Sequence, residues 1–154
     1  MSVPWTLIVH TLHVASGMVW AGGAIFMALV GWRALLERPP SEARVTLERM
    51  GRLMAISGSL VLVLGIVRGT LLGPVRSWDF LIGSPYGRTF AVALVVTVLL
   101  AIYGARSGRT LPARLRDGDR WRPDAARIVR RDSVIHMAGL TVIVLCMCAM
   151  HFGY

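Results

Sequence analysis

Four apolar stretches divide this chain of 154 residues, at roughly residues 5–32, 53–75, 86–105 and 133–152. Each is close to the length of about 20 residues that a helix needs to cross a bilayer. Hydrophobic residues make up 55% of the sequence, which is too many for an ordinary soluble domain. The sequence therefore predicts an all-α fold, an integral membrane four-helix bundle. Nothing remains for a separate soluble domain, so we expect residues 1–154 to form a single transmembrane domain.

The charge pattern predicts how these helices are oriented. All 17 basic residues are arginine, and the net charge is +9. Five arginines lie in residues 33–52 and nine in residues 106–132, whereas the region between the second and third stretches carries few. By the positive-inside rule the two arginine-rich loops face the cytoplasm, and both termini lie outside. This distribution marks topology and lipid contact, so no nucleic-acid partner is expected.

Glycines in the second stretch predict close helix packing. Gly51, Gly58 and Gly65 are spaced by seven residues, which keeps them on nearly one face of a helix. Small residues at this spacing let another helix approach closely in a membrane. Pro39 and Pro40 end the first segment, and Ser41 is the expected N-cap of the next helix.

Two histidines stand out in the first stretch, because ionisable residues inside membrane segments are candidate functional residues. His10 and His13 are three positions apart and share one helix face. Gly17, Ala21 and Ala24 continue that face with small side chains. Such a face accommodates either a close helix contact or a flat, bulky ligand.

Depth indicates which histidines can share a ligand. His13 lies 20 residues from Arg33, and His151 lies 20 residues from Arg131. At a rise of about 1.5 Å per residue, both imidazoles lie roughly 30 Å from the inner boundary. His10 lies about one turn further out.

His136 and Arg68 lie at other depths in the predicted bundle than His13 and His151. His136 precedes His151 by 15 residues, about 22 Å along a helix, so the two cannot share one small site. We expect His136 to hydrogen-bond a backbone carbonyl or a partner in the arginine-rich loop. Arg68 lies 16 residues beyond Arg52, within the outer leaflet, where an arginine snorkels or pairs with a carboxylate.

These positions favour a haem b site. His13 and His151 are the expected axial iron ligands, with His10 as the alternative to His13. Arg68 is the expected partner of the haem propionates. With both axial positions filled, the expected role is electron transfer between a quinone or a redox partner protein and an acceptor.

Copper is the competing cofactor. Soft and borderline ligands gather toward the same end of the predicted bundle: His10, His13, Met147, Met150, His151 and either Cys146 or Cys148. Cys146 and Cys148 are two apart on one helix and cannot bridge each other. A further alternative is a cofactor-free subunit of a membrane complex, and an oligomer is compatible with each of these readings.

The first stretch carries a motif, His13-Val-Ala-Ser-Gly-Met-Val-Trp20-Ala-Gly, that resembles the first helix of the CopD-like membrane superfamily. That group includes HemJ-type protoporphyrinogen oxidases and the copper-resistance CopD domain. Tyr86-Gly87-Arg88 and Arg131-Asp-Ser-Val also look similar to the starts of its third and fourth helices. The resemblance implies a four-helix bundle of a bacterial-type inner membrane, and it implies that His13 is a haem b ligand.

The chain departs from this family at two positions. The third helix is apolar around Ala91–Ala93, where the family often has a lysine. His136 stands where the family often has an acidic residue. These departures favour a haem protein over a HemJ-like oxidase, and a CopD-like copper protein stays open as an alternative.

Overall fold

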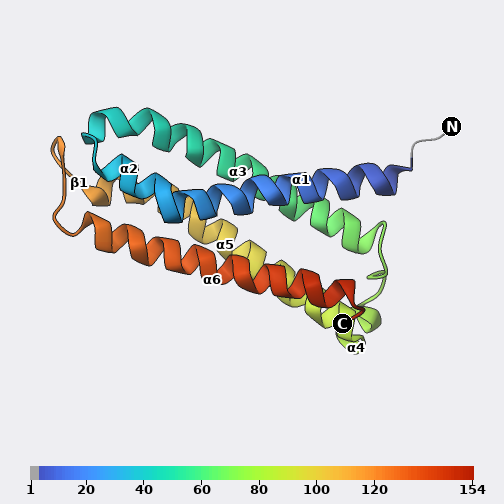
Figure 1. Cartoon of the computed structure of the whole chain (residues 1–154). Helices are drawn as coiled ribbons and strands as arrows, with labels where there is room; N and C mark the ends of the chain where they lie inside the picture. Colours follow the sequence, from blue (N-terminus) through green and yellow to red (C-terminus); the bar gives the residue numbers. More distant parts are fainter. Residues whose placement is uncertain (1–3) are drawn as a thin grey trace.

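The computed structural model describes residues 4–154 and consists almost entirely of antiparallel helices (Figure 1). The first pass is one continuous helix with a π-helical turn near its C-terminal end. The four passes are α1 with η1 and α2 (Trp5–Phe26, Met27–Gly31 and Trp32–Leu36), α3 (Pro40–Thr70), α5 (Pro85–Leu115) and α6 (Ala125–His151). All four are long and apolar enough to cross a membrane. The predicted all-α, multi-pass four-helix membrane bundle is confirmed.

At the arginine-rich end of the bundle the helices extend beyond the apolar stretches that mark them in the sequence. At the other end α3 stops at Thr70, five residues before the predicted end at 75. α3 begins at Pro40 rather than near residue 53, and α6 begins at Ala125 rather than near residue 133. α5 continues to Leu115, ten residues past the predicted end at 105. Apolarity reports only the part of a helix that meets lipid, whereas the additional turns carry arginines and lie beyond it.

The start of α3 differs from the prediction. Pro39 is the N-cap and Pro40 is the first helical residue, with no side-chain cap, so the expected N-cap role of Ser41 is wrong. Proline suits the first helical position because its φ is already fixed near the helical value and its missing N–H would have no partner there.

The connection between α3 and α5 folds into a short helix. α3 ends at Thr70, and α4 (Trp78–Gly83) packs against the start of α5. Ser77 caps α4 by accepting the Phe80 N–H at 3.1 Å. Ser84 caps α5 by accepting the Gly87 N–H at 2.9 Å.

The arginine-rich connection between α5 and α6 is also structured. It forms a two-stranded hairpin, β1 (Arg116–Asp117) with β2 (Arg120–Trp121), that turns at Gly118 with φ of 63°. The indole N–H of Trp121 donates to the carbonyl of Arg38 at 2.6 Å. This bond ties the hairpin to the turn between α2 and α3, so the arginine-rich loop is held against the bundle.

Packing pairs α1 with α3 and α5 with α6, and contacts between α3 and α5 and between α1 and α6 close the bundle. The core cluster at its middle contains Trp20, Val61, Leu100, Leu140 and Ile143. Many large apolar side chains outside this cluster are exposed. In four helices of membrane-spanning length, such side chains are suited to contact lipid.

Candidate cofactor pocket

A cavity of about 550 Å³ opens among all four long helices, at the end of the bundle where α1 begins and α6 ends (Figure 1). We call it the histidine pocket. Its lining includes His10, His13, Arg68, Phe90, Met147 and His151. The four residues predicted as cofactor ligands or partners, His10, His13, His151 and Arg68, are thus brought to one cavity.

α1 supplies His13, and the glycine face of α3 makes room for it. A Cβ atom built on Gly65 would lie 3.1 Å from Cε1 of His13, closer than most real Cβ contacts. The imidazole therefore packs directly against the α3 backbone. Its Nδ1 atom is buried and has no hydrogen-bond partner among residues 4–154. Leaving a buried polar nitrogen unpaired costs about 1–3 kcal/mol, so a partner for this nitrogen would stabilise the protein.

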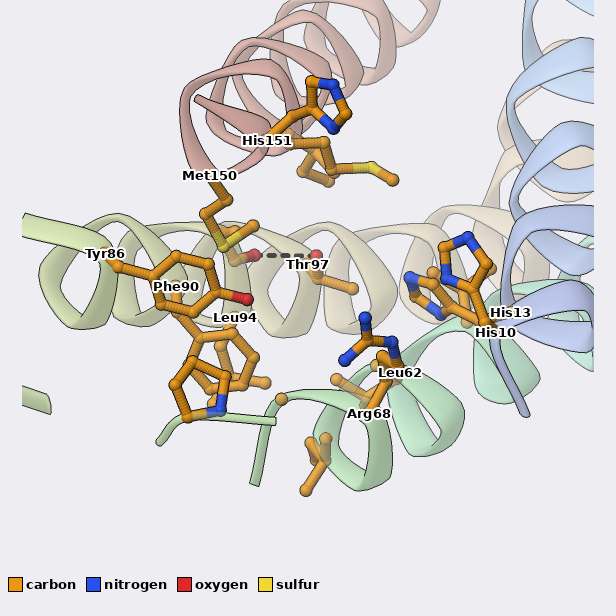
Figure 2. Close-up of a pocket in the computed structure, with 18 residues that line it drawn as sticks. His10, His13, Leu62, Arg68, Tyr86, Phe90, Leu94, Thr97, Met150 and His151 are labelled. Atoms are coloured by element: carbon orange, nitrogen blue, oxygen red, sulfur yellow. Dashed lines mark hydrogen bonds between the residues drawn. The ribbon is translucent and has the colours of Figure 1, made fainter. Parts of the chain in front are cut away.

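Arg68 lies one turn after Gly65 on α3. Its Nε atom is also buried and unpaired within the described part of the chain. Figure 2 shows its guanidinium extending into the space between the histidine side chains of α1 and Thr97 of α5. The pocket therefore contains a cation suited to an acidic group.

α6 places His151 on the other side of the cavity from Arg68 (Figure 2). Its ring lies edge-on to Phe152, with 5.3 Å between the ring centroids. Met147 and Met150 belong to the same part of α6 and also line the pocket. Imidazoles from α1 and α6 thus border one space with two thioethers beside them.

Other candidate ligands lie elsewhere. Cys146 and Cys148 are free thiols that do not line the pocket. His136 faces a different cavity, and its Nδ1 lies 3.0 Å from the carbonyl oxygen of Asp132. The expected backbone hydrogen bond of His136 is therefore present, and its separation from the other histidines agrees with the depth argument.

Sequence reasoning expected a partner for His136 in the arginine-rich segment but did not identify Asp132 or the α5 residues that contact it. The carboxylate of Asp132 lies 3.3 Å from Nδ1 of His136 and also accepts hydrogen bonds from Tyr103, at 3.0 Å, and from Ser107. The one signal in the sequence is the four-residue spacing of Asp132 and His136, which places them on one helix face. The α5 partners precede Asp132 by 29 and 25 residues and carry no such signal.

The residues of α5 that form one wall of the histidine pocket were also not identified from the sequence. Tyr86, Phe90 and Thr97 line the cavity, and the Thr97 hydroxyl donates to the carbonyl of Ala93 at 2.7 Å. This bond satisfies the hydroxyl within its own helix. The wall is therefore mostly apolar and aromatic, as is usual in pockets for small molecules and cofactors.

The pocket has the size of a ligand site and is lined by imidazole, thioether and guanidinium groups. Its volume lies within the range of about 300–1,000 Å³ that is typical of ligand sites. Residues 4–154 contain no group of three or more His, Cys, Asp or Glu side chains arranged around one metal position. The donors present are imidazoles on separate helices, an arginine and thioethers, and imidazole and thioether are both known axial ligands of haem iron.

No family model, curated protein or solved structure that was compared with the chain matches it. The resemblance of the first helix to CopD-like proteins stays a prediction. The fold defines a multi-pass membrane protein of four helices with a cavity at each end.

Proposed function

We propose that this protein binds haem b in the histidine pocket and transfers electrons. His13 and His151 are the axial ligands, with His10 as the alternative to His13, and Arg68 pairs with the propionates. The observation that carries the proposal is that imidazoles from α1 and α6 and the Arg68 guanidinium line one cavity.

The unpaired buried atoms support this assignment. Nδ1 of His13 and Nε of Arg68 both lack partners within residues 4–154. Buried polar atoms without partners are rare in folded proteins, and a ligand that satisfies them removes their cost. A cofactor with a metal centre and acidic side groups supplies a partner for an imidazole and for a guanidinium.

Haem bound through two histidines supplies a one-electron redox centre with no open iron position. The residues of this chain hold that centre in place, exclude water from it with the aromatic wall of α5, and neutralise its acidic groups. The proposed electron partner is a quinone or a redox protein. The arginine distribution supports an orientation with both termini outside. The resemblance of the first helix to CopD-like proteins supports placement in a bacterial-type inner membrane.

A specific observation favours copper as a second candidate. Met147 and Met150 line the same pocket as His10, His13 and His151, and thioethers with imidazoles suit Cu(I). In that case the protein is a CopD-like copper-binding or transport protein. Neither cysteine would take part, because Cys146 and Cys148 do not line the cavity.

The test is a reduced-minus-oxidised visible spectrum of the purified protein with a pyridine haemochrome count. We expect one b-type haem per chain, six-coordinate in both oxidation states. His13→Ala and His151→Ala should each lose haem or become five-coordinate, because each removes one axial ligand. His136→Ala is the matched control and should keep the six-coordinate spectrum, since His136 faces the other cavity.

The outcomes separate the two candidates. A colourless protein that carries copper, lost in Met147→Ala and Met150→Ala, would replace haem with the copper function. A preparation without haem or copper would overturn both. If His13→Ala and His151→Ala both keep six-coordinate haem, the ligand assignment is wrong.

A further inference from the structure

A second cavity, of about 640 Å³, lies at the opposite end of the bundle from the histidine pocket. We call it the arginine pocket. Its lining includes Trp20, Arg52, Met54, Arg109, Arg116 and His136. The proposed haem function makes no use of this cavity.

The charge of the arginine pocket is not balanced by its own acidic groups. Arg52, Arg109 and Arg116 have no carboxylate within 4.0 Å among residues 4–154, where ion pairs link only three other pairs of side chains. The fourth arginine of the lining, Arg44, is already paired with Glu48 at 2.8 Å. The Nε of Arg116 donates to the carbonyl of Pro112 at 3.3 Å, which leaves its other N–H groups for a ligand. Three guanidinium groups without a carboxylate partner therefore face this cavity.

Asp132 also lines this cavity but does not offset those arginines. Its carboxylate is occupied by Tyr103, Ser107 and His136 and is only 13% exposed. The hydrogen bonds hold the carboxylate between α5 and α6, away from a role as a partner for the arginines. The hydrogen bonds of Asp132 are satisfied within the protein, whereas the three arginines are exposed and pair with no carboxylate among residues 4–154.

The other part of the cavity is apolar. Trp20, Met54 and Leu100 line it, and each belongs to a helix that is long and apolar enough to cross a membrane. The three arginines lie outside the apolar stretches, at the side of the cavity opposite these apolar residues. A ligand that fills the whole cavity must therefore carry an anionic head and an apolar chain.

We propose that the arginine pocket binds an anionic phospholipid. Its phosphate pairs with Arg52, Arg109 and Arg116, and one acyl chain lies along Trp20, Met54 and Leu100. Guanidinium groups bind phosphate oxygens in a bidentate fashion, which makes arginine well suited to this headgroup. A free phosphate would satisfy the same arginines but would leave the apolar part of the cavity unfilled. The proposal does not depend on haem binding.

Tryptophan fluorescence provides the test, since Trp20, Trp32 and Trp121 line this cavity. The full chain is placed in phosphatidylcholine vesicles that contain a small fraction of phosphatidylglycerol with brominated acyl chains. We expect stronger quenching than from the same fraction of brominated phosphatidylcholine. Arg52→Gln with Arg109→Gln should lower the relative affinity for phosphatidylglycerol by about fivefold for each arginine removed.

The matched control removes the same charge outside the cavity. Arg114→Gln with Arg127→Gln changes two exposed arginines that do not line the pocket, and it should keep the preference for phosphatidylglycerol. An equal loss in both double variants would mean attraction by surface charge alone and would overturn the proposal. Equal quenching by the two brominated lipids in the unmodified protein would also overturn it.

Inorganic phosphate distinguishes the two sources of the anion. If the site binds free phosphate, millimolar phosphate should raise the melting temperature of the detergent-purified protein but not that of the Arg52→Gln, Arg109→Gln variant. That result, together with equal quenching by brominated phosphatidylglycerol and brominated phosphatidylcholine, would show that the lipid assignment is wrong.

Discussion

The Asp132 carboxylate contacts three polar side chains at the α5–α6 interface. It accepts hydrogen bonds from Tyr103 and Ser107 of α5 and lies within 3.3 Å of Nδ1 of His136, on its own helix. The carboxylate is 13% exposed and the His136 side chain 21%. A buried carboxylate needs such partners, because removing an ionised group from water is costly.

We therefore expect Asp132→Ala to destabilise the protein. The substitution removes a charged acceptor from the Tyr103 and Ser107 hydroxyls and from His136, which keeps only the backbone carbonyl of residue 132. Hydrogen bonds to charged groups are worth about 1.5–3 kcal/mol each. Since these terms are not additive, we expect a loss of about 3 kcal/mol in the free energy of unfolding. Denaturant unfolding in detergent measures it.

Asp124→Ala is the control for this change. Asp124 is paired with Arg122 at 3.1 Å, and that hydrogen bond keeps the pKa of the Asp124 carboxyl below its usual value. Both side chains are largely exposed, so the pair should contribute little and the free energy of unfolding should stay unchanged in the same denaturant experiment. An equal loss of stability in the two variants would contradict the role assigned to Asp132.

The positions of the histidines along the chain predicted part of the site. Depth counting placed His13 and His151 at one level, and both line the histidine pocket. It placed His136 elsewhere, which agrees with the structure. The Tyr103 and Ser107 contacts of Asp132 depend on how α5 rotates against α6, and counting residues along one helix carries no information on that rotation.

At the scale of elements, the contact between α1 and α3 is built on two of the three glycines spaced by seven. A Cβ atom on Gly58 would lie 3.0 Å from Nε1 of Trp20, and one on Gly65 would lie 3.1 Å from His13. Gly51 has nothing within 4 Å of its Cβ position. The predicted packing face is therefore confirmed for Gly58 and Gly65 and wrong for Gly51.

This difference gives a matched pair of variants on one helix. Gly58→Val should destabilise the bundle by about 1–3 kcal/mol, because the added carbons force Trp20 out of its position. Gly51→Val should leave stability unchanged or slightly higher, because valine is a somewhat better helix former than glycine. Thermal unfolding of both variants measures the difference, and equal effects would mean that α1 does not pack against Gly58.

The two ends of the bundle differ at the scale of the whole molecule. α1 begins and α6 ends at the end that holds the histidine pocket, and the β1–β2 hairpin lies at the other (Figure 1). A chain that crosses the membrane four times has both termini on the same side, whichever side that is. The arginine distribution favours the hairpin end for the cytoplasm.

Reporter insertions test that orientation. A reporter of cytoplasmic location inserted at Gly118 should be active, and the same reporter fused after Tyr154 should be inactive. The physical reason is that the nine arginines of residues 106–132 resist transfer across the membrane. The reverse pattern would invert the topology, and equal activity at both positions would contradict four membrane passes.

The sequence by itself determined the number of passes, their approximate centres and the level of each histidine, because apolar run length and rise per residue depend only on the local chain. It did not determine the ends of α3, α5 and α6, since helix continues past the lipid-facing part. Only the tertiary structure decided that Phe90 and Thr97 border the same cavity as His13 and His151, and that Arg52 and Arg109 border another. These relations depend on the rotation and tilt of each helix against its neighbours, which side-chain packing sets.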